Sequence, residues 1–186
     1  MADWRLIVDS PGLGYGGVLS PLGSTGGVLF PYTPQIQVSY TAQYDPGSLV
    51  HSNYKVHMYV ASSVENIQVT GDFTAQDSDE AAYLMAVIHF FKSATKMFYG
   101  GSGAPPPLCF MTGMGTYQFN RSPIAVTSFN LNLPSDVDYI DGGGSMVPTK
   151  MQIAFSAIPI ISRKKVSNEF NLQAYASGAL IGAGFW

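Results

Sequence analysis

The sequence has few charged residues. Only 11% of its 186 residues are Asp, Glu, Lys or Arg, whereas soluble domains typically carry about 25%. The hydrophobic fraction of 46% is ordinary, so the shortage falls on the residues that normally cover a surface in contact with water. The chain is long enough for one domain with a real core. We infer that much of its outer surface is not left facing water.

Basic residues are scarce as well. Nine Lys and Arg stand against 12 Asp and Glu, which gives a net charge of −3. A protein that grips phosphates needs a basic patch, so this balance argues against a nucleic-acid binder. The one basic cluster, Arg163–Lys165, follows a predicted strand and is typical of a solvated strand end.

Cysteines and long hydrophobic runs are nearly absent. The single cysteine, Cys109, excludes an internal disulfide and a Cys-based zinc site, and its setting in PPPLCFM predicts a buried, small hydrophobic residue. No run approaches the roughly 18 apolar residues of a membrane helix. The start MADWRLIVD lacks the basic and apolar regions of a signal peptide. We therefore expect assembly in the cytoplasm without membrane insertion.

Patterns of catalytic and ligand-binding residues are also missing. A G-x-G-x-x-G spacing at Gly12–Gly17 is followed by VLSP and not by a helix, so a dinucleotide site is not expected. His51 and His57 could share a strand face but have no third metal ligand nearby in sequence. The acidic stretch Asp136–Asp141 lacks EF-hand spacing. We predict no enzyme activity, no cofactor and no metal site.

Alternating polar and apolar residues are present. The run Gln35–Tyr44 alternates throughout and predicts a long antiparallel strand, with a turn at Asp45–Gly47. Further strands are predicted at Val64–Phe73, Leu108–Phe119, Ile124–Leu133 and Lys150–Phe155. The polar side of the first strand carries Gln, Ser and Thr but no formal charge. Such a side is unusual for a face in open water, although an ordinary solvent face of odd composition remains the alternative.

One helix is predicted at about 77–99. Asp77 can cap it, with Glu80 three residues later, and Gly100-Gly101 can end it. The helix has two adjacent apolar stripes and only a narrow wet strip that contains His89. A helix that is apolar over most of its circumference is buried on more than one side. Either a neighbouring subunit or a loop or arm of the same chain could cover the second stripe.

The two ends of the chain differ from its middle. In the first 30 residues GGVLSP returns ten residues later as GGVLFP, and this density of glycine and proline predicts an irregular N-terminal arm without its own core. Residues 31–162 form the predicted β domain. Residues 163–186 form an apolar tail that ends in Phe185-Trp186, and an aromatic end without a core should dock on another subunit or ring.

Several stretches carry a resemblance to a known family. In chain order, GGVLFPYTPQIQVSYTAQYDP, HSNY, HFFKSATKMFYG, GAPPPLCF, SFNLNLPSDVDYI and VPTKMQIAF resemble the baseplate tail-tube proteins of contractile-tailed bacteriophages. The similarity runs from about Gly26 to about Ile160, and the segment from the helix to PPP and the stretch NLPSDVDY are its most specific parts. The arm before Phe30 and the tail from Glu169 match least.

The resemblance implies a mainly β (α+β) tail-tube fold, which is an antiparallel β-sandwich or partial barrel with one flanking helix. It also implies a homohexamer whose sheets join edge to edge into a barrel around a lumen. This baseplate ring of the virion would join the central hub to a second baseplate tube ring or to the tail tube protein. It would initiate the tube and let phage DNA pass without specific binding. Contact with the sheath and the tape measure is left open.

The alternation and the helix stripes then assign residues to surfaces. The lumen-facing set is Gln35, Gln37, Ser39, Thr41, Gln43, Gln68, Thr70 and Gln152. The subunit-interface set is Tyr83, Phe90, Phe98, Tyr99, Phe185 and Trp186. The runner-up interpretation is the repeating tail tube protein itself, and a rival of another class is a monomeric ligand-binding β-module.

Overall fold

The computed structural model describes residues 5–48, 50–98, 103–142 and 144–185. The strands are β1 (Ile7–Asp9), β2 (Val28–Leu29), β3 (Gln35–Gln37), β4 (Tyr40–Gly47), β5 (Val56–Val64), β6 (Ile67–Thr74), β7 (Cys109–Gly113), β8 (Phe119–Leu131), β9 (Tyr139–Asp141), β10 (Met146–Pro148) and β11 (Lys150–Pro159). The α-helices are α1 (Ser78–Ala94), α2 (Arg163–Glu169) and α3 (Leu172–Ala176), and two 3-10 helices are η1 (Gly17–Gly23) and η2 (Ile181–Ala183). None of the described helices is long and apolar enough to cross a membrane.

Seven strands form one curved sheet in the order β2-β1-β7-β8-β11-β6-β3. Every pair in this sheet is antiparallel, so the predicted mainly antiparallel α+β class is confirmed. The sheet remains open. The chain passes from its β2 edge to its β3 edge through residues 30–34, and Phe30 in this connection packs on Phe73 of β6 with ring centroids 5.0 Å apart.

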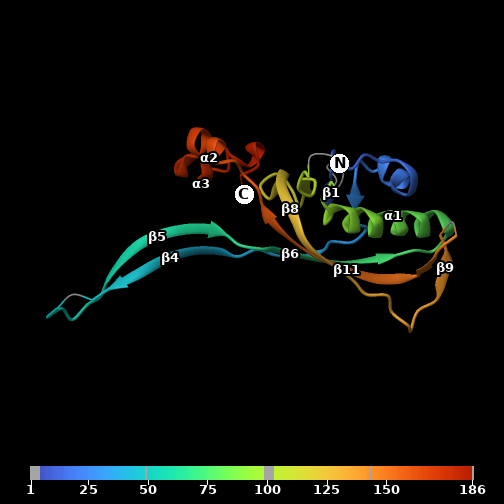
Figure 1. Cartoon of the computed structure of the whole chain (residues 1–186), viewed down its shortest axis with the longest axis horizontal. Helices are drawn as coiled ribbons and strands as arrows, with labels where there is room; N and C mark the ends of the chain where they lie inside the picture. The colour runs from blue at the N-terminus through green and yellow to red at the C-terminus, as the bar shows by residue number, and fades with distance from the viewer. Residues whose placement is uncertain (1–4, 49, 99–102, 143, 186) are drawn as a thin grey trace.

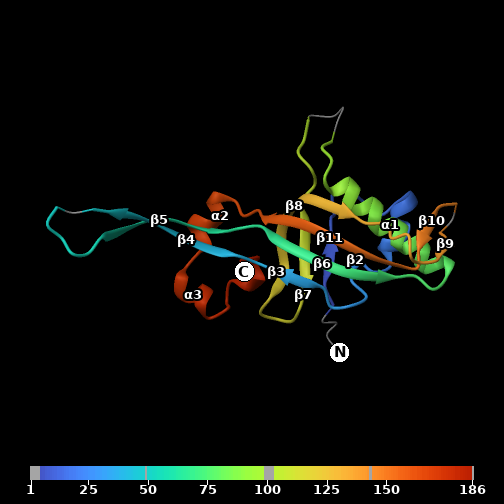
Figure 2. The same cartoon turned by 90° about the horizontal axis from the view of Figure 1, so that it is seen from below.

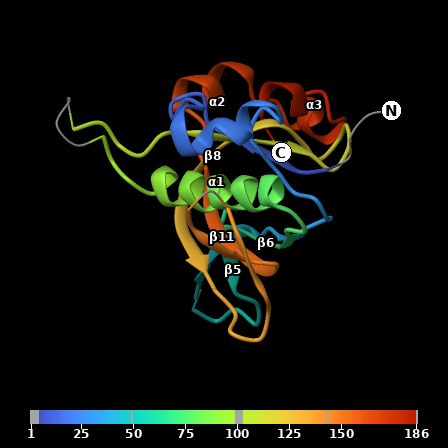
Figure 3. The same ribbon diagram turned by 90° about the vertical axis from the view of Figure 1, so that its right-hand side faces the viewer.

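The core lies between this sheet and α1. Alternate residues of β6 and β11 are buried on the face toward the helix, as expected for strands with one covered face. Phe91 of α1 stacks on Phe155 at 4.7 Å and on Phe129 at 5.3 Å between ring centroids. Figure 3 shows α1 enclosed between β6 and β11 on one side and η1 on the other.

The predicted helix is present but shorter than expected. The Asp77 side chain accepts a hydrogen bond from the Glu80 N–H at 2.8 Å, which confirms the predicted cap. The helix ends at Ala94 and not near 99, because the Thr95 hydroxyl donates to the Lys92 carbonyl and the Phe98 N–H leaves the helix to donate to the Ala104 carbonyl at 3.1 Å. Gly100-Gly101, the predicted helix end, lies outside the described residues.

Residues 5–30 belong to the body and not to a loose arm. The two similar sequences adopt different structures, because GGVLSP lies mostly in η1 and GGVLFP supplies β2. Leu22, Val28 and Phe30 are fully buried. The Tyr83 hydroxyl of the second stripe is bonded to the backbone of Leu29, and η1 packs along α1. The arm of the same chain therefore covers the helix at Tyr83, whereas Met97 at the end of the same stripe is 49% exposed.

Strands β4 and β5 pair with each other and project from the body as a two-stranded ribbon (Figures 1 and 2). The predicted strand over residues 35–44 is split at Val38–Ser39 into β3 and β4. The predicted turn at Asp45–Gly47 is wrong, because these residues continue β4 and pair with β5. Pro46 is tolerated there because the ribbon has free edges, where a missing N–H costs no ladder bond.

The C-terminal residues 163–185 form α2, α3 and η2 beside β8 (Figure 1). Arg163–Lys165 is therefore the first turn of a helix and not a strand end, and the Ser162 hydroxyl caps it by accepting from the Lys165 N–H at 3.2 Å. Phe185 is buried against Phe170, with ring centroids 5.8 Å apart. This aromatic residue docks on its own chain and not on a neighbour.

Candidate assembly surfaces

The register of β3, β6 and β11 builds a polar face on the side of the sheet away from α1. Gln35 lies opposite Thr70, and Gln37 lies opposite Gln68. Partners across an antiparallel ladder point to the same side, so these four side chains share one face. Gln152 on β11 joins them, because it lies opposite Asp72 of β6, which is two residues from Thr70 and points to the same side. Five of the eight predicted lumen residues are thus brought together, and the face continues through Ser128, Asn130, Ala154 and Ser156.

This polar face carries little charge. Asp72 accepts a hydrogen bond from the Gln152 side-chain amide at 3.2 Å, and Lys150 lies at the end of β11. The rest of the face consists of amides, hydroxyls and small residues. Such a surface offers weak hydrogen bonding to any solute but no cluster of cations that would hold a phosphate backbone.

The other three predicted lumen residues lie off this face. Ser39 is in the link between β3 and β4, while Thr41 and Gln43 are on the projecting ribbon. The Thr41 hydroxyl donates to the Glu65 carboxylate at 2.8 Å. The polar and apolar residues alternate without interruption from Gln35 to Tyr44, so the sequence does not indicate that the strand breaks at Val38–Ser39.

The ribbon is exposed on both faces. Its large apolar side chains are between 46% and 60% accessible: Tyr40, Tyr44, Val56, Met58, Tyr59 and Val60. The Tyr44 and Tyr59 rings contact each other across the ribbon with centroids 5.7 Å apart. Sequence analysis missed β5, because neither face of this strand is covered by the body and its residues do not alternate between apolar and polar. Apolar side chains gathered on a surface in this way mark a site of interaction.

The total accessible surface is unusually large for the mass of the chain. The structure exposes 11423 Å² at 20.0 kDa, which is about 2,700 Å² more than the roughly 8,700 Å² expected of a compact monomer of that mass. A standard protein interface covers about 800 Å² on each partner. The excess would therefore supply several interfaces per chain.

The predicted interface residues fall into three groups. Phe90 and Phe185 are buried within their own chain, so assigning them to a subunit interface was wrong. Tyr83 is half-buried, and its hydroxyl is bonded to the backbone of Leu29. Phe98 is 44% exposed and is available to a partner. Tyr99 and Trp186 lie outside the described residues.

Cys109, the single cysteine of the sequence, is buried. Burial raises the pKa of the Cys109 thiol to about 11, against a smaller lowering by the hydrogen bond with Ser10. A thiol with such a pKa stays protonated and unreactive near neutral pH. His51 and His57 are exposed on the ribbon and its tip. Within the described ranges, no group of three or more His, Cys, Asp or Glu could hold a metal ion.

Comparison with known proteins gives little further information. No protein-family model matches the chain, and no curated protein matches it. Among solved structures, the chain is similar to one described as "Tail of empty GTA particle computed with helical refinement, C6 symmetry". The identity is 12% and the TM-score 0.35, over 69% of this chain and 78% of that one. So weak a similarity does not establish a shared fold.

Proposed function

We propose that this protein is a structural subunit of a contractile phage tail. Six copies form a baseplate ring that joins the central hub to the tail tube, initiates tube assembly and lines the channel for the genome. Its role is mechanical and not enzymatic, and its place is the virion. The sequence resemblance over about Gly26–Ile160 led to this proposal, and the exposed surfaces support it.

The projecting ribbon is the observation that carries the proposal. An isolated two-stranded hairpin is marginal in water, yet this ribbon extends from the body with apolar side chains on both faces. Neighbouring subunits that cover the ribbon would remove its apolar side chains from water and so stabilise it. The low charged fraction of 11% agrees, since the centres of interfaces are depleted of charge and enriched in aromatic residues.

The polar face supports the channel assignment. Lysine and arginine side chains bind DNA phosphates and displace the counterions of the DNA. A channel wall without such side chains therefore lets DNA pass easily. Gln35, Gln37, Gln68 and Gln152 give the face polar but uncharged side chains. Six such faces around an axis would form a lumen that stays wetted and does not hold the polyanion.

A charge-bearing ribbon tests the assembly role. We expect the double variant Val56→Asp with Val60→Asp to fold normally, because both side chains are exposed and neither lies opposite an acidic residue, and to abolish tails in cells that carry the complete tail gene set. The matched control is Val18→Asp with Leu133→Asp, which changes two exposed apolar residues away from the ribbon. Normal tails from the ribbon variant would overturn the proposal.

Counting copies separates the initiator from the repeating tube protein. Quantitative mass spectrometry of purified particles should find about one ring's worth of this chain, since closed cyclic rings have a fixed copy number. Many rings' worth would assign the chain to the tube itself and would leave its structural role intact.

A further inference from the structure

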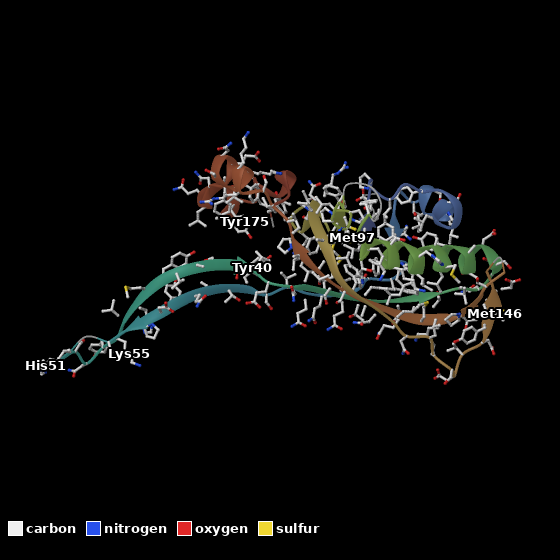
Figure 4. All side chains as sticks on the ribbon, viewed as in Figure 1. Tyr40, His51, Lys55, Met97, Met146 and Tyr175 are labelled. Atoms are coloured by element: carbon white, nitrogen blue, oxygen red, sulfur yellow. The ribbon has the colours of Figure 1, made fainter. Side chains whose placement is uncertain are left out.

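A trough runs between the root of the ribbon and the C-terminal helices. It has a volume of about 650 Å³ and is lined by Tyr40, Tyr59 and Val64 from the ribbon and by Val166, Phe170 and Phe185 from the C-terminal segment. A second hollow of about 760 Å³ adjoins it, and Tyr40 and Tyr175 line both. Figure 4 shows these two tyrosines on facing sides of the gap, with Tyr175 on α3 and Tyr40 at the start of β4.

The wall formed by the C-terminal segment is held by its own contacts. Phe170 packs against both Tyr175 and Phe185, at 5.7 Å and 5.8 Å between ring centroids. The Lys165 ammonium lies 5.6 Å from the centre of the Phe185 ring and donates to the Ala183 carbonyl. The segment therefore stands as a built wall beside the ribbon, and the trough is not a gap left by a loose tail.

The trough is lined mainly by apolar side chains, and the outer ribbon exposes five apolar side chains among polar ones: Tyr44, Val50, Tyr54, Val56 and Met58. The outer half of the ribbon, residues 44–48 and 50–58, lies away from the C-terminal segment of its own chain, as Figure 1 shows. We propose that the trough receives the outer half of the ribbon from a second copy of this chain. This inference rests on the proposed function, because it requires copies to assemble with one another.

Surface area and charge favour a second copy as the occupant. The excess of about 2,700 Å² over a compact monomer exceeds what one standard interface covers, so one small molecule in the trough would leave most of it exposed. The outer ribbon carries Asp45 and Lys55. The trough has complementary charges nearby, because α2 begins with exposed Arg163 and Lys164 and the ribbon root carries exposed Glu65.

A disulfide-trapping experiment tests the contact. In a Cys109→Ala background, one tagged copy carries Met58→Cys and an untagged copy carries Val166→Cys, and both are produced with the complete tail gene set. Met58 is 59% exposed and Val166 41%. We expect the mixed disulfide between tagged and untagged copies to be the main crosslinked product in assembled particles. The matched control pairs Met58→Cys with Met146→Cys, which is 63% exposed at the far end of the molecule (Figure 4).

The outcomes separate this inference from the proposed function. Assembled rings with no Met58–Val166 product would overturn the docking site and leave the ring proposal standing. A dominant Met58–Met146 product would also overturn it, because the ribbon would then dock on the opposite end of the next copy. If the wild-type chain formed no rings when produced with the complete tail gene set, both the docking site and the ring proposal would be contradicted.

A charge placed in the trough gives a second test. We expect Val166→Asp to weaken assembly by at least about tenfold, because docking of the ribbon would remove a carboxylate from water in a trough lined mainly by apolar side chains. Ser167→Asp, on the adjacent exposed position of α2, is the matched control and should assemble normally. Equal assembly of the two variants would argue against an apolar ribbon in the trough, and binding of a small apolar ligand by the monomer would identify a different occupant.

Discussion

The Tyr83 hydroxyl is bonded to both backbone groups of Leu29: it accepts from the N–H at 2.8 Å and donates to the carbonyl at 3.2 Å. A residue of α1 thereby satisfies the outward-facing groups of β2, an edge strand of the seven-stranded sheet. Edge strands with unpaired groups invite pairing with other chains. The β2 edge is thus closed at Leu29, whereas β3 at the other edge has no described strand on its outer side.

Removing this hydroxyl should lower stability. We expect Tyr83→Phe to reduce the free energy of unfolding by about 1–3 kcal/mol, because it leaves two backbone groups of Leu29 without partners in a partly buried place. Urea denaturation measures the change. Tyr32→Phe, which removes an exposed hydroxyl 3.1 Å from Thr74, should cost less than about 0.5 kcal/mol. Equal losses in the two variants would contradict the edge-capping role.

The fold also requires that residue 71 has no side chain. A Cβ there would lie 2.6 Å from the ring of Phe30, which packs across the sheet on Phe73 and Phe155. We expect Gly71→Ala to destabilise the protein by about 1–3 kcal/mol through overpacking. Gly16→Ala is the control, because nothing lies within 4 Å of its Cβ position. If Gly71→Ala left the free energy of unfolding unchanged, the Phe30 ring would not be fixed against residue 71.

Alkaline pH should weaken the fold through Cys109. Its pKa rises from 9.0 to about 11 on burial, so the unfolded thiol ionises before the folded one does. The folded state then holds the proton more tightly, and its stability falls as pH rises from about 9 through 11, by up to about 2–3 kcal/mol. Denaturation at pH 8 and pH 10.5 measures this fall. Cys109→Ala should show a smaller fall, and identical pH dependence in the two proteins would refute the assignment.

Positive charge on the polar face should hinder genome passage and leave the ring intact. We expect Gln37→Lys with Asn130→Lys to give normal particle numbers but reduced infectivity per particle, since each lysine adds a phosphate contact that holds DNA. The control places lysines at Gln76 and Thr116, which are exposed elsewhere. Unchanged infectivity in the face variant would remove the lumen assignment.

Local sequence signals predicted the parts of the fold whose environment is regular. Alternation identified β6 and β11 because one side of each packs on α1 and the other does not. The Asp77 cap was readable because its hydrogen bond is local. The caps of the C-terminal helices, Ser162 and Asn171, form equally local hydrogen bonds. These helices were nevertheless not predicted, because the composition of residues 163–186 indicated an apolar tail.

Features that depend on distant residues could not be read. Leu22 and Phe30 are buried by elements far away in the chain, so a stretch rich in glycine and proline looked like a free arm. Phe90 and Phe185 look like interface residues in the sequence because nothing local indicates that other parts of the chain bury them. The ribbon was missed because two exposed faces give no alternation, although this surface now carries the proposed function.

The most direct measurement is a cryo-EM map of the intact particle that contains this chain. The account predicts six copies in a closed ring, with Gln37 and Gln68 facing the bore and each β4–β5 ribbon covered by neighbouring subunits. A single copy whose ribbon stands free in solvent, or a ring with the polar face turned outward, would contradict it.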